Sequence, residues 1–145
     1  MLYFAYGMNT DTQGMALRCP GAVSKGAARL VDHCFRFAHH ADVVACENHY
    51  VDGVLWEIDQ QHLNSLDRLE GYPWYYDRQK LPVQYQGQIV QAQCYRMQPG
   101  VSDGMPARHY LDCLLRGYAE HGVPTNQIYL SLQAIEKTED FVSTI

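Results

Sequence analysis

The chain has 145 residues, of which 47% are hydrophobic and 12% aromatic, and its formal net charge at neutral pH is −5. A chain of this length can form one hydrophobic core that buries about two-thirds of the surface of the unfolded chain. The negative charge and the lack of any run of lysine or arginine argue against nucleic acid or an anionic membrane surface as a partner, and favour a small polar molecule. We expect a single domain over residues 1–135 and a loose polar tail over residues 136–145.

The N-terminal segment carries no basic leader, and no apolar stretch reaches the roughly 20 residues that span a bilayer. We therefore expect a cytoplasmic protein. In that compartment, five cysteines without C-x-x-C spacing are expected to be reduced thiols, most of them buried. These are Cys19, Cys34, Cys46, Cys94 and Cys113.

The apolar run at residues 2–5 predicts a short buried strand. It leads directly into residues 6–9, where Gly7 marks a turn before a helix predicted over residues 10–17. Backbone N–H groups converge where a helix begins, which suits a carboxylate or an oxyanion. An ordinary turn is the alternative interpretation, since the chain contains no consensus phosphate-binding loop.

Short runs with partial apolar alternation follow along the chain and are typical of an antiparallel or mixed sheet that curls toward a barrel. The predicted strands lie at residues 2–5, 26–31, 33–37, 51–57, 77–84 and 89–96. The predicted helices lie at residues 10–17, 60–70, 107–121 and 126–134. A hairpin turn is expected at residues 85–88 and a loop at residues 98–105.

The helix predicted over residues 60–70 places a carboxylate on its apolar face. Leu63, Leu66 and Glu70 share one side of this helix, and Gly71 ends it. Burial and the negative end of the helix dipole both disfavour the ionised form, so the pKa of Glu70 is expected to rise toward neutrality, as a general base at neutral pH requires. Alternatively, Glu70 lies in a frayed last turn and bends out to water.

The seven histidines raise the question of a metal site, because His39 and His40 lie near Cys46 and His49 in the sequence. Adjacent histidines in a strand point to opposite faces and cannot both bind one ion without distortion. We therefore expect no metal site. A Cys–His nucleophilic pair remains open, but the sequence singles out no cysteine for that role.

Two aromatic features have more than one interpretation. Tyr110 belongs to an apolar stripe of the helix over residues 107–121, which favours packing in the core. The aromatic cluster at residues 72–76 can line a ligand pocket, and there we expect Tyr76 to face the site and Trp74 to lie at the surface or in an interface.

Five segments occur in an order and spacing that a known family shares. They read YFAYGMN at residues 3–9, RCPGA at 18–22, GVLWE at 53–57, LDRLEGYP at 66–73 followed by YDR at 76–78, and PARHY at 106–110. Together they resemble the gamma-glutamylcyclotransferase-like family, with its Y-F-A-Y-G-S-N, G-V-L-W/Y, L-D-x-x-E-G-Y-P and P-S-x-x-Y motifs. Met8 and Ala107 depart from it, each standing where the family has serine.

The resemblance implies an α+β fold, a small barrel with helices on one side, and an enzyme that cyclises a gamma-glutamyl amide to 5-oxoproline and releases the amine without a cofactor. It implies Glu70 as the general acid/base. The residues implied to bind substrate are Tyr6, Gly7, Met8, Asn9 and Tyr110. To these we add Tyr76, which the aromatic cluster is expected to turn toward the site. Methionine at position 8 keeps the main-chain donor but removes a hydroxyl and crowds the pocket, so we expect it to affect substrate choice more than chemistry.

Two alternatives remain open at this point. One is a non-catalytic member that binds a small molecule or a partner in the same pocket. The other is cyclotransfer on a less common substrate, such as a gamma-glutamyl-lysine remnant or a polyamine conjugate. The sequence makes no prediction of the oligomeric state.

Overall fold

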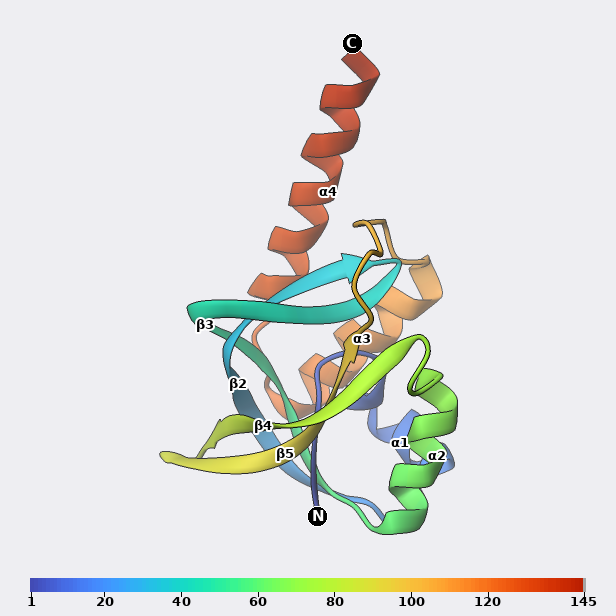
Figure 1. Ribbon diagram of the computed structural model, residues 1–145, viewed down its shortest axis with the longest axis vertical. Helices are drawn as coiled ribbons and strands as arrows, with labels where there is room; N and C mark the ends of the chain where they lie inside the picture. The colour runs from blue at the N-terminus through green and yellow to red at the C-terminus, as the bar shows by residue number, and fades with distance from the viewer. Residues whose placement is uncertain (145) are drawn as a thin grey trace.

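In residues 1–144, which the computed structural model describes, five strands close into a barrel in the order β1-β3-β2-β4-β5 (Figure 1). The strands are β1 (Leu2–Ala5), β2 (Val23–Ala38), β3 (His40–Glu57), β4 (Tyr76–Tyr85) and β5 (Gln88–Met97). Strand β1 is antiparallel to β3 and parallel to β5, so the barrel is mixed. This confirms the predicted α+β barrel.

The helices lie around the barrel and at one end of it (Figure 1). They are the 3-10 helix η1 (Met8–Thr10), α1 (Thr12–Arg18), α2 (Gln60–Glu70), α3 (Arg108–His121) and α4 (Asn126–Thr144). Helix α3 packs closely on η1, because a Cβ on Gly117 would lie only 2.5 Å from the carbonyl carbon of Thr10. The segment that follows β1 is therefore held between the barrel and α3.

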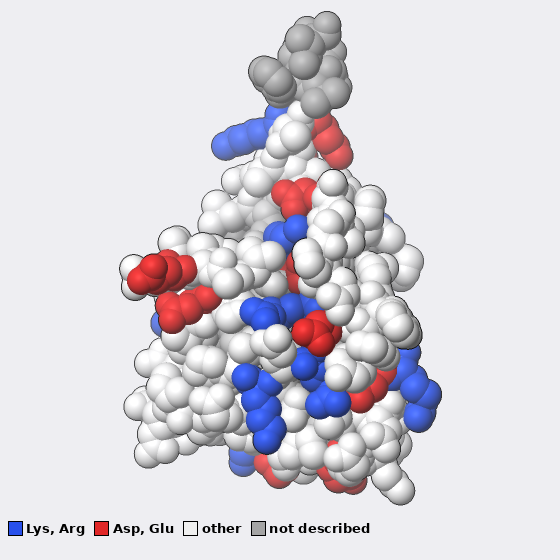
Figure 2. All heavy atoms as spheres, in the orientation of Figure 1, with Lys and Arg blue, Asp and Glu red and all other residues white. Residues whose placement is uncertain are grey.

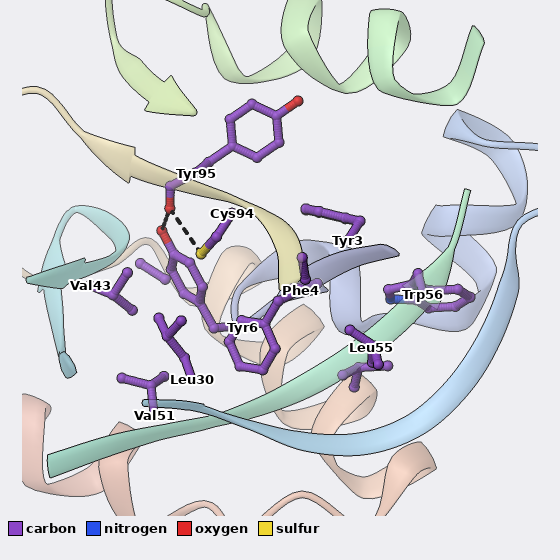
Figure 3. Close-up of a cluster of buried hydrophobic side chains, with 14 of the residues drawn as sticks. Tyr3, Phe4, Tyr6, Leu30, Val43, Val51, Leu55, Trp56, Cys94 and Tyr95 are labelled. Carbon is purple, nitrogen blue, oxygen red and sulfur yellow. Dashed lines mark hydrogen bonds between the residues drawn. The ribbon is translucent and has the colours of Figure 1, made fainter. Parts of the chain in front are cut away.

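The core fills the barrel with aromatic and branched side chains. Phe4, Leu30, Val51 and Leu55 are fully buried there, as Figure 3 shows. Gly53 lets β1 and β3 approach, since a Cβ at this position would clash with the Ala5 carbonyl oxygen. On the face in view in Figure 2, basic and acidic side chains are interspersed.

The hairpin of β2 and β3 is longer than predicted. The predicted strands at residues 26–31 and 33–37 are one strand, interrupted by an irregularity at Asp32, which has a positive φ of 58°. Strand β3 begins at His40, well before residue 51, because residues 40–45 pair with residues 33–38 of β2 directly across the turn at His39.

The expectation of five reduced thiols is wrong for one pair. Cys34 and Cys46 form a disulfide, while Cys19, Cys94 and Cys113 are free. The two bonded residues lie on paired strands with their Cα atoms 5.5 Å apart, a separation that suits a disulfide. Their spacing of 12 residues carries no local signal of this pairing.

Helix α4 is longer than the predicted helix over residues 126–134, and it corrects the expected loose tail. Residues 136–144 continue the helix, which projects away from the barrel in Figure 1. Glutamate and lysine are good helix formers, and adding residues to an existing helix is far easier than starting one. Among the described residues, we find no helix long and apolar enough to cross a bilayer.

Candidate active site

A cavity opens where the end of β1, the end of α2, the start of β4 and the start of α3 meet. The structure brings all seven of the site residues inferred from the sequence to this cavity. They are Tyr6, Gly7, Met8, Asn9, Glu70, Tyr76 and Tyr110.

Helix α2 sets the position of Glu70. The Asp59 carboxylate accepts a hydrogen bond from the His62 N–H at 2.8 Å, and the His62 ring accepts one from the Asp59 N–H at 3.1 Å, so the helix begins with a reciprocal cap. Gly71 ends the helix with a left-handed φ of 65°. The Glu70 side chain therefore leaves the last turn of a helix with defined ends.

The last turns of α2 are also tied to the barrel. The Asp67 carboxylate accepts hydrogen bonds from Arg78 on β4 at 2.9 Å and from the Tyr95 hydroxyl on β5 at 2.6 Å. Figure 3 shows the Tyr95 ring turned away from the core toward this helix. These two contacts orient the helix face that carries Glu70.

A short hydrogen-bonded network of polar side chains leads away from the Glu70 carboxylate through Asn9. The Asn9 amide nitrogen donates to Glu70 at 3.3 Å and to the Tyr3 hydroxyl at 2.9 Å. Arg18 donates to the Asn9 amide oxygen at 3.1 Å, which fixes the orientation of the amide. The Glu70 carboxylate therefore accepts from the neutral amide of Asn9, and the Arg18 cation lies on the far side of that amide.

Burial raises the pKa of Glu70 to about 7, and the positive charge of Arg18 opposes that rise. A carboxyl group with this pKa exchanges protons readily near neutral pH, which is the property required of a general acid/base. Burial also raises the pKa of Tyr110 and Tyr76, so both hydroxyls stay neutral.

The hydroxyls of Tyr76 and Tyr110 bind the backbone of one residue, Ala41, on either side of its Cα atom. Tyr76 donates to the Ala41 carbonyl oxygen at 2.6 Å, whereas Tyr110 accepts from the Ala41 N–H at 2.9 Å. The Tyr110 proton is therefore free to be donated into the cavity, and the Tyr76 oxygen is free to accept. The two tyrosines are chemically identical, but Tyr110 offers the cavity a hydrogen-bond donor and Tyr76 offers it an acceptor, because their backbone partners differ.

The floor of the cavity is fixed in a similar way. The Tyr6 hydroxyl donates to the Tyr95 carbonyl at 2.6 Å, a bond drawn in Figure 3, and the Tyr118 hydroxyl on α3 donates to the Tyr6 carbonyl at 2.7 Å. Gly7 follows, and a Cβ there would lie 3.0 Å from the Tyr110 hydroxyl. A side chain at position 7 would therefore crowd that hydroxyl.

Sequence reasoning missed several residues of the cavity wall. Tyr3, His40 and Tyr95 also line it, together with Tyr75 from the aromatic cluster that was expected to line a pocket. Tyr3 and Tyr95 lie within predicted strands, and no local signal separates a tyrosine that reaches a cavity from one that packs in a core. His40 reaches the site only because β3 begins eleven residues earlier than expected.

The chain is similar in sequence to a known protein family and to named proteins. Residues 3–112 match the family model described as gamma-glutamyl cyclotransferase, AIG2-like. A human protein named gamma-glutamylcyclotransferase is 28% identical over 152 residues, covering 95% of this chain and 80% of that protein. The bovine protein of the same name is 28% identical over 137 residues, covering 85% of this chain and 72% of that one.

Solved structures agree with the sequence relatives. One named gamma-glutamyl cyclotransferase superposes with a TM-score of 0.80 at 28% identity, covering 90% of this chain and 85% of that one.

Proposed function

The chain belongs to the gamma-glutamyl cyclotransferase, AIG2-like family and is an enzyme of the cyclotransferase type, and on this basis we propose that Glu70 is its acid/base. The reaction converts a gamma-glutamyl amide into 5-oxoproline and a free amine. The observation that carries the role of Glu70 is a carboxylate with a pKa of about 7 that lines a cavity among fixed hydroxyls.

The first step removes a proton from the substrate. The alpha-ammonium group must lose one before its nitrogen can attack the gamma-carbonyl carbon, and ionised Glu70 accepts it. The nucleophile and the electrophile belong to one molecule, so holding the folded conformer supplies on the order of 7–11 kcal/mol relative to the bimolecular reaction. Glu70 then donates the proton to the departing nitrogen as its bond to the gamma-carbon breaks. The ring nitrogen loses its remaining extra proton to the released amine, so 5-oxoproline forms and Glu70 is again ionised.

The polarity of the tyrosines supports distinct roles for them. Tyr76 presents an acceptor, which suits the ammonium group of the substrate. Tyr110 presents a donor, which suits the oxygen of the gamma-carbonyl as negative charge develops on it. We assign Tyr3 a donor role as well, because its hydroxyl accepts from Asn9 and keeps its own proton free.

The loop of Gly7, Met8 and Asn9 supplies main-chain groups to the same cavity. It enters η1 directly after β1, so its N–H groups lie at the start of a helical turn. We propose that the loop binds the glutamyl part of the substrate and that Met8 narrows the choice of leaving amine. Among the described residues, the cavity lining includes no lysine or arginine, so the alpha-carboxylate relies on N–H and O–H donors.

The substrate is a small gamma-glutamyl molecule. A cytoplasmic location and the absence of a nucleic-acid partner remain predictions. The competing proposal is a member that binds such a molecule without turnover. The raised pKa of Glu70 favours the enzyme, because a carboxyl group used only for binding gains nothing from a pKa near neutrality.

The decisive experiment compares the wild type with Glu70→Gln. Release of 5-oxoproline is followed with gamma-glutamyl-alanine, gamma-glutamyl-epsilon-lysine, gamma-glutamyl amines and glutathione. Loss of general acid/base catalysis is expected to lower kcat by about 10²- to 10⁴-fold, while 5-oxoproline still binds. Glu136→Gln, the same change at an exposed position on α4, is the matched control. Near-full activity of Glu70→Gln overturns the assignment, and binding without release by the wild type favours the non-catalytic member.

A further inference from the structure

A second group of chemically reactive side chains lies on the β2–β3 hairpin. The sulfur atoms of Cys34 and Cys46 and a ring nitrogen of His49 all lie within 4.8 Å of one another. None of the three lines the catalytic cavity. Cys34 comes from one strand, and the other two come from a four-residue excursion of the facing strand.

The excursion has a defined backbone. Strand pairing passes from His33↔Ala45 to Val31↔Tyr50, so residues 46–49 bulge opposite Asp32. Asn48 adopts a left-handed φ of 64°, and its N–H donates to the Asp32 carboxylate at 3.0 Å. This turn brings the first and last residues of a Cys-x-x-His sequence to the same side as Cys34.

His49 is oriented in the way that metal-binding histidines are. Its Nδ1 lies 2.9 Å from the Glu47 carbonyl oxygen. A carbonyl oxygen can only accept, so Nδ1 carries the proton, and the neutral ring keeps its lone pair on Nε2. Donation of one ring N–H to a backbone carbonyl is the usual outer contact of a histidine whose other nitrogen binds a metal.

We propose that Cys34, Cys46 and His49 form a binding site for a soft divalent cation of the Zn²⁺ class once the disulfide is reduced. Two thiolates and one imidazole are a donor set that Zn²⁺ favours, with a fourth position left to water or another oxygen. In a tetrahedral site with Zn–S bonds of about 2.3 Å, the donor atoms lie about 3.7 Å apart. Two thiols on Cα atoms 5.5 Å apart reach that separation by side-chain rotation alone.

The chemistry balances in two steps. A reductant such as a dithiol or a phosphine gives two electrons to the Cys34–Cys46 bond, two protons come from the reductant or from water, and two thiols form. Zn²⁺ then binds as both thiols release their protons to solvent, and the site gains no net charge. The disulfide and the metal site exclude each other, so the reducing cytoplasm expected from the sequence is the condition that favours the metal.

Nearby charges are compatible with a cation. Glu47 lies in the excursion and Asp32 lies opposite it on β2, and both are acidic. Arg36 follows Cys34 by two positions on the same strand, but it is paired with Asp42 at 3.5 Å and with Asp103 at 3.4 Å, so its charge is compensated.

The test uses the full chain, reduced with a phosphine, freed of reductant under inert gas and titrated with Co²⁺ as a spectroscopic probe for Zn²⁺. We expect a sulfur-to-cobalt charge-transfer band and tetrahedral visible bands at one ion per chain, displaced by Zn²⁺ and absent from the oxidised protein. Cys34→Ser and Cys46→Ser are expected to remove the charge-transfer band. His49→Ala, which leaves both thiols in place, is expected to weaken Co²⁺ binding by about tenfold or more.

The matched control is Cys113→Ser, which removes a free thiol from another part of the molecule and should leave the titration unchanged. Circular dichroism of each variant shows whether the barrel is folded. The proposal is overturned if the reduced wild type gives no sulfur-to-cobalt band, if Cys113→Ser removes it, or if folded His49→Ala binds Co²⁺ as tightly as the wild type does.

Discussion

The side-chain amide of Asn9 donates a hydrogen bond to the Glu70 carboxylate at 3.3 Å, although the two residues are 61 positions apart in the chain. The same amide is fixed from behind by Arg18. The loop after β1 and the end of α2 are therefore linked through one amide, which connects Arg18 to the Glu70 carboxylate.

Replacing Arg18 should shift the pH dependence of catalysis. The positive charge of Arg18 lowers the pKa of Glu70, so Arg18→Gln raises that pKa above about 7. Because ionised Glu70 is the form that accepts the proton, kcat/KM rises with pH through this pKa, and the acidic limb of the profile should move to higher pH. Arg68→Gln, an exposed cation on α2, is the control and should leave the limb in place. An unmoved limb in Arg18→Gln contradicts the electrostatic link.

Glu70 should reduce the stability of the folded protein at alkaline pH. Its pKa is about 7 in the folded chain and near 4.5 for an ordinary glutamate, so between these values the folded state binds more protons than the unfolded state does. The free energy of unfolding therefore falls as pH rises through this window, and the loss is complete above pH 7.

Glutamine does not titrate, so Glu70→Gln should be more stable than the wild type at pH 8, by up to about 3 kcal/mol, and the gain should vanish near pH 4.5. Chemical unfolding at both pH values measures the difference. A gain that is the same at the two pH values would show that packing, not ionisation, is responsible.

The opposite polarities of Tyr76 and Tyr110 predict different kinetic effects. Tyr110→Phe removes a donor to the developing oxyanion and should lower kcat by about 10²-fold with a smaller change in KM. Tyr76→Phe removes an acceptor for the ground-state ammonium and should raise KM more than it lowers kcat. Steady-state kinetics separate the two, with exposed Tyr129→Phe as the control. Identical effects on kcat and KM would refute the assignment of distinct roles.

Gly117→Ala should destabilise the protein even though alanine favours helices. The gain in helix propensity is about 1 kcal/mol, whereas overpacking costs about 1–3 kcal/mol, and here the added Cβ meets the backbone of Thr10 and Asp11. We expect a lower Tm and, because η1 is displaced, weaker substrate binding. His109→Ala, an exposed change in the same helix, should raise or preserve the Tm. A Gly117→Ala variant as stable as His109→Ala would contradict the close packing of α3 on η1.

A structural feature of this protein could be predicted from the sequence when the residues that determine it are close together in the chain. Glu70 and Gly71 could be assigned because a helix face and its terminating glycine lie within one turn. The partner of Cys34 could not, since it depends on the register of two strands and on the bulge at Asp32. The extension of α4 was missed because polar residues are equally typical of a tail and of an exposed helix.

The candidate site follows the same rule. Residues 6–9 and Glu70 belong to short motifs, whereas Tyr3 and Tyr95 reach the cavity only through the closure of the barrel. Tyr110 had two interpretations, and the structure supports elements of both, since the residue packs against the core and also lines the cavity.

The backbone of Ala41 carries a consequence for evolution and engineering. It decides which of two tyrosine hydroxyls gives a proton and which receives one, yet it does so through atoms that every residue except proline possesses. A substitution at position 41 keeps these backbone atoms, but Ala41 is buried beside Gly7, so only small side chains fit there. The polarity of these two hydroxyls therefore depends on backbone atoms, and a comparison of aligned side chains would not reveal it.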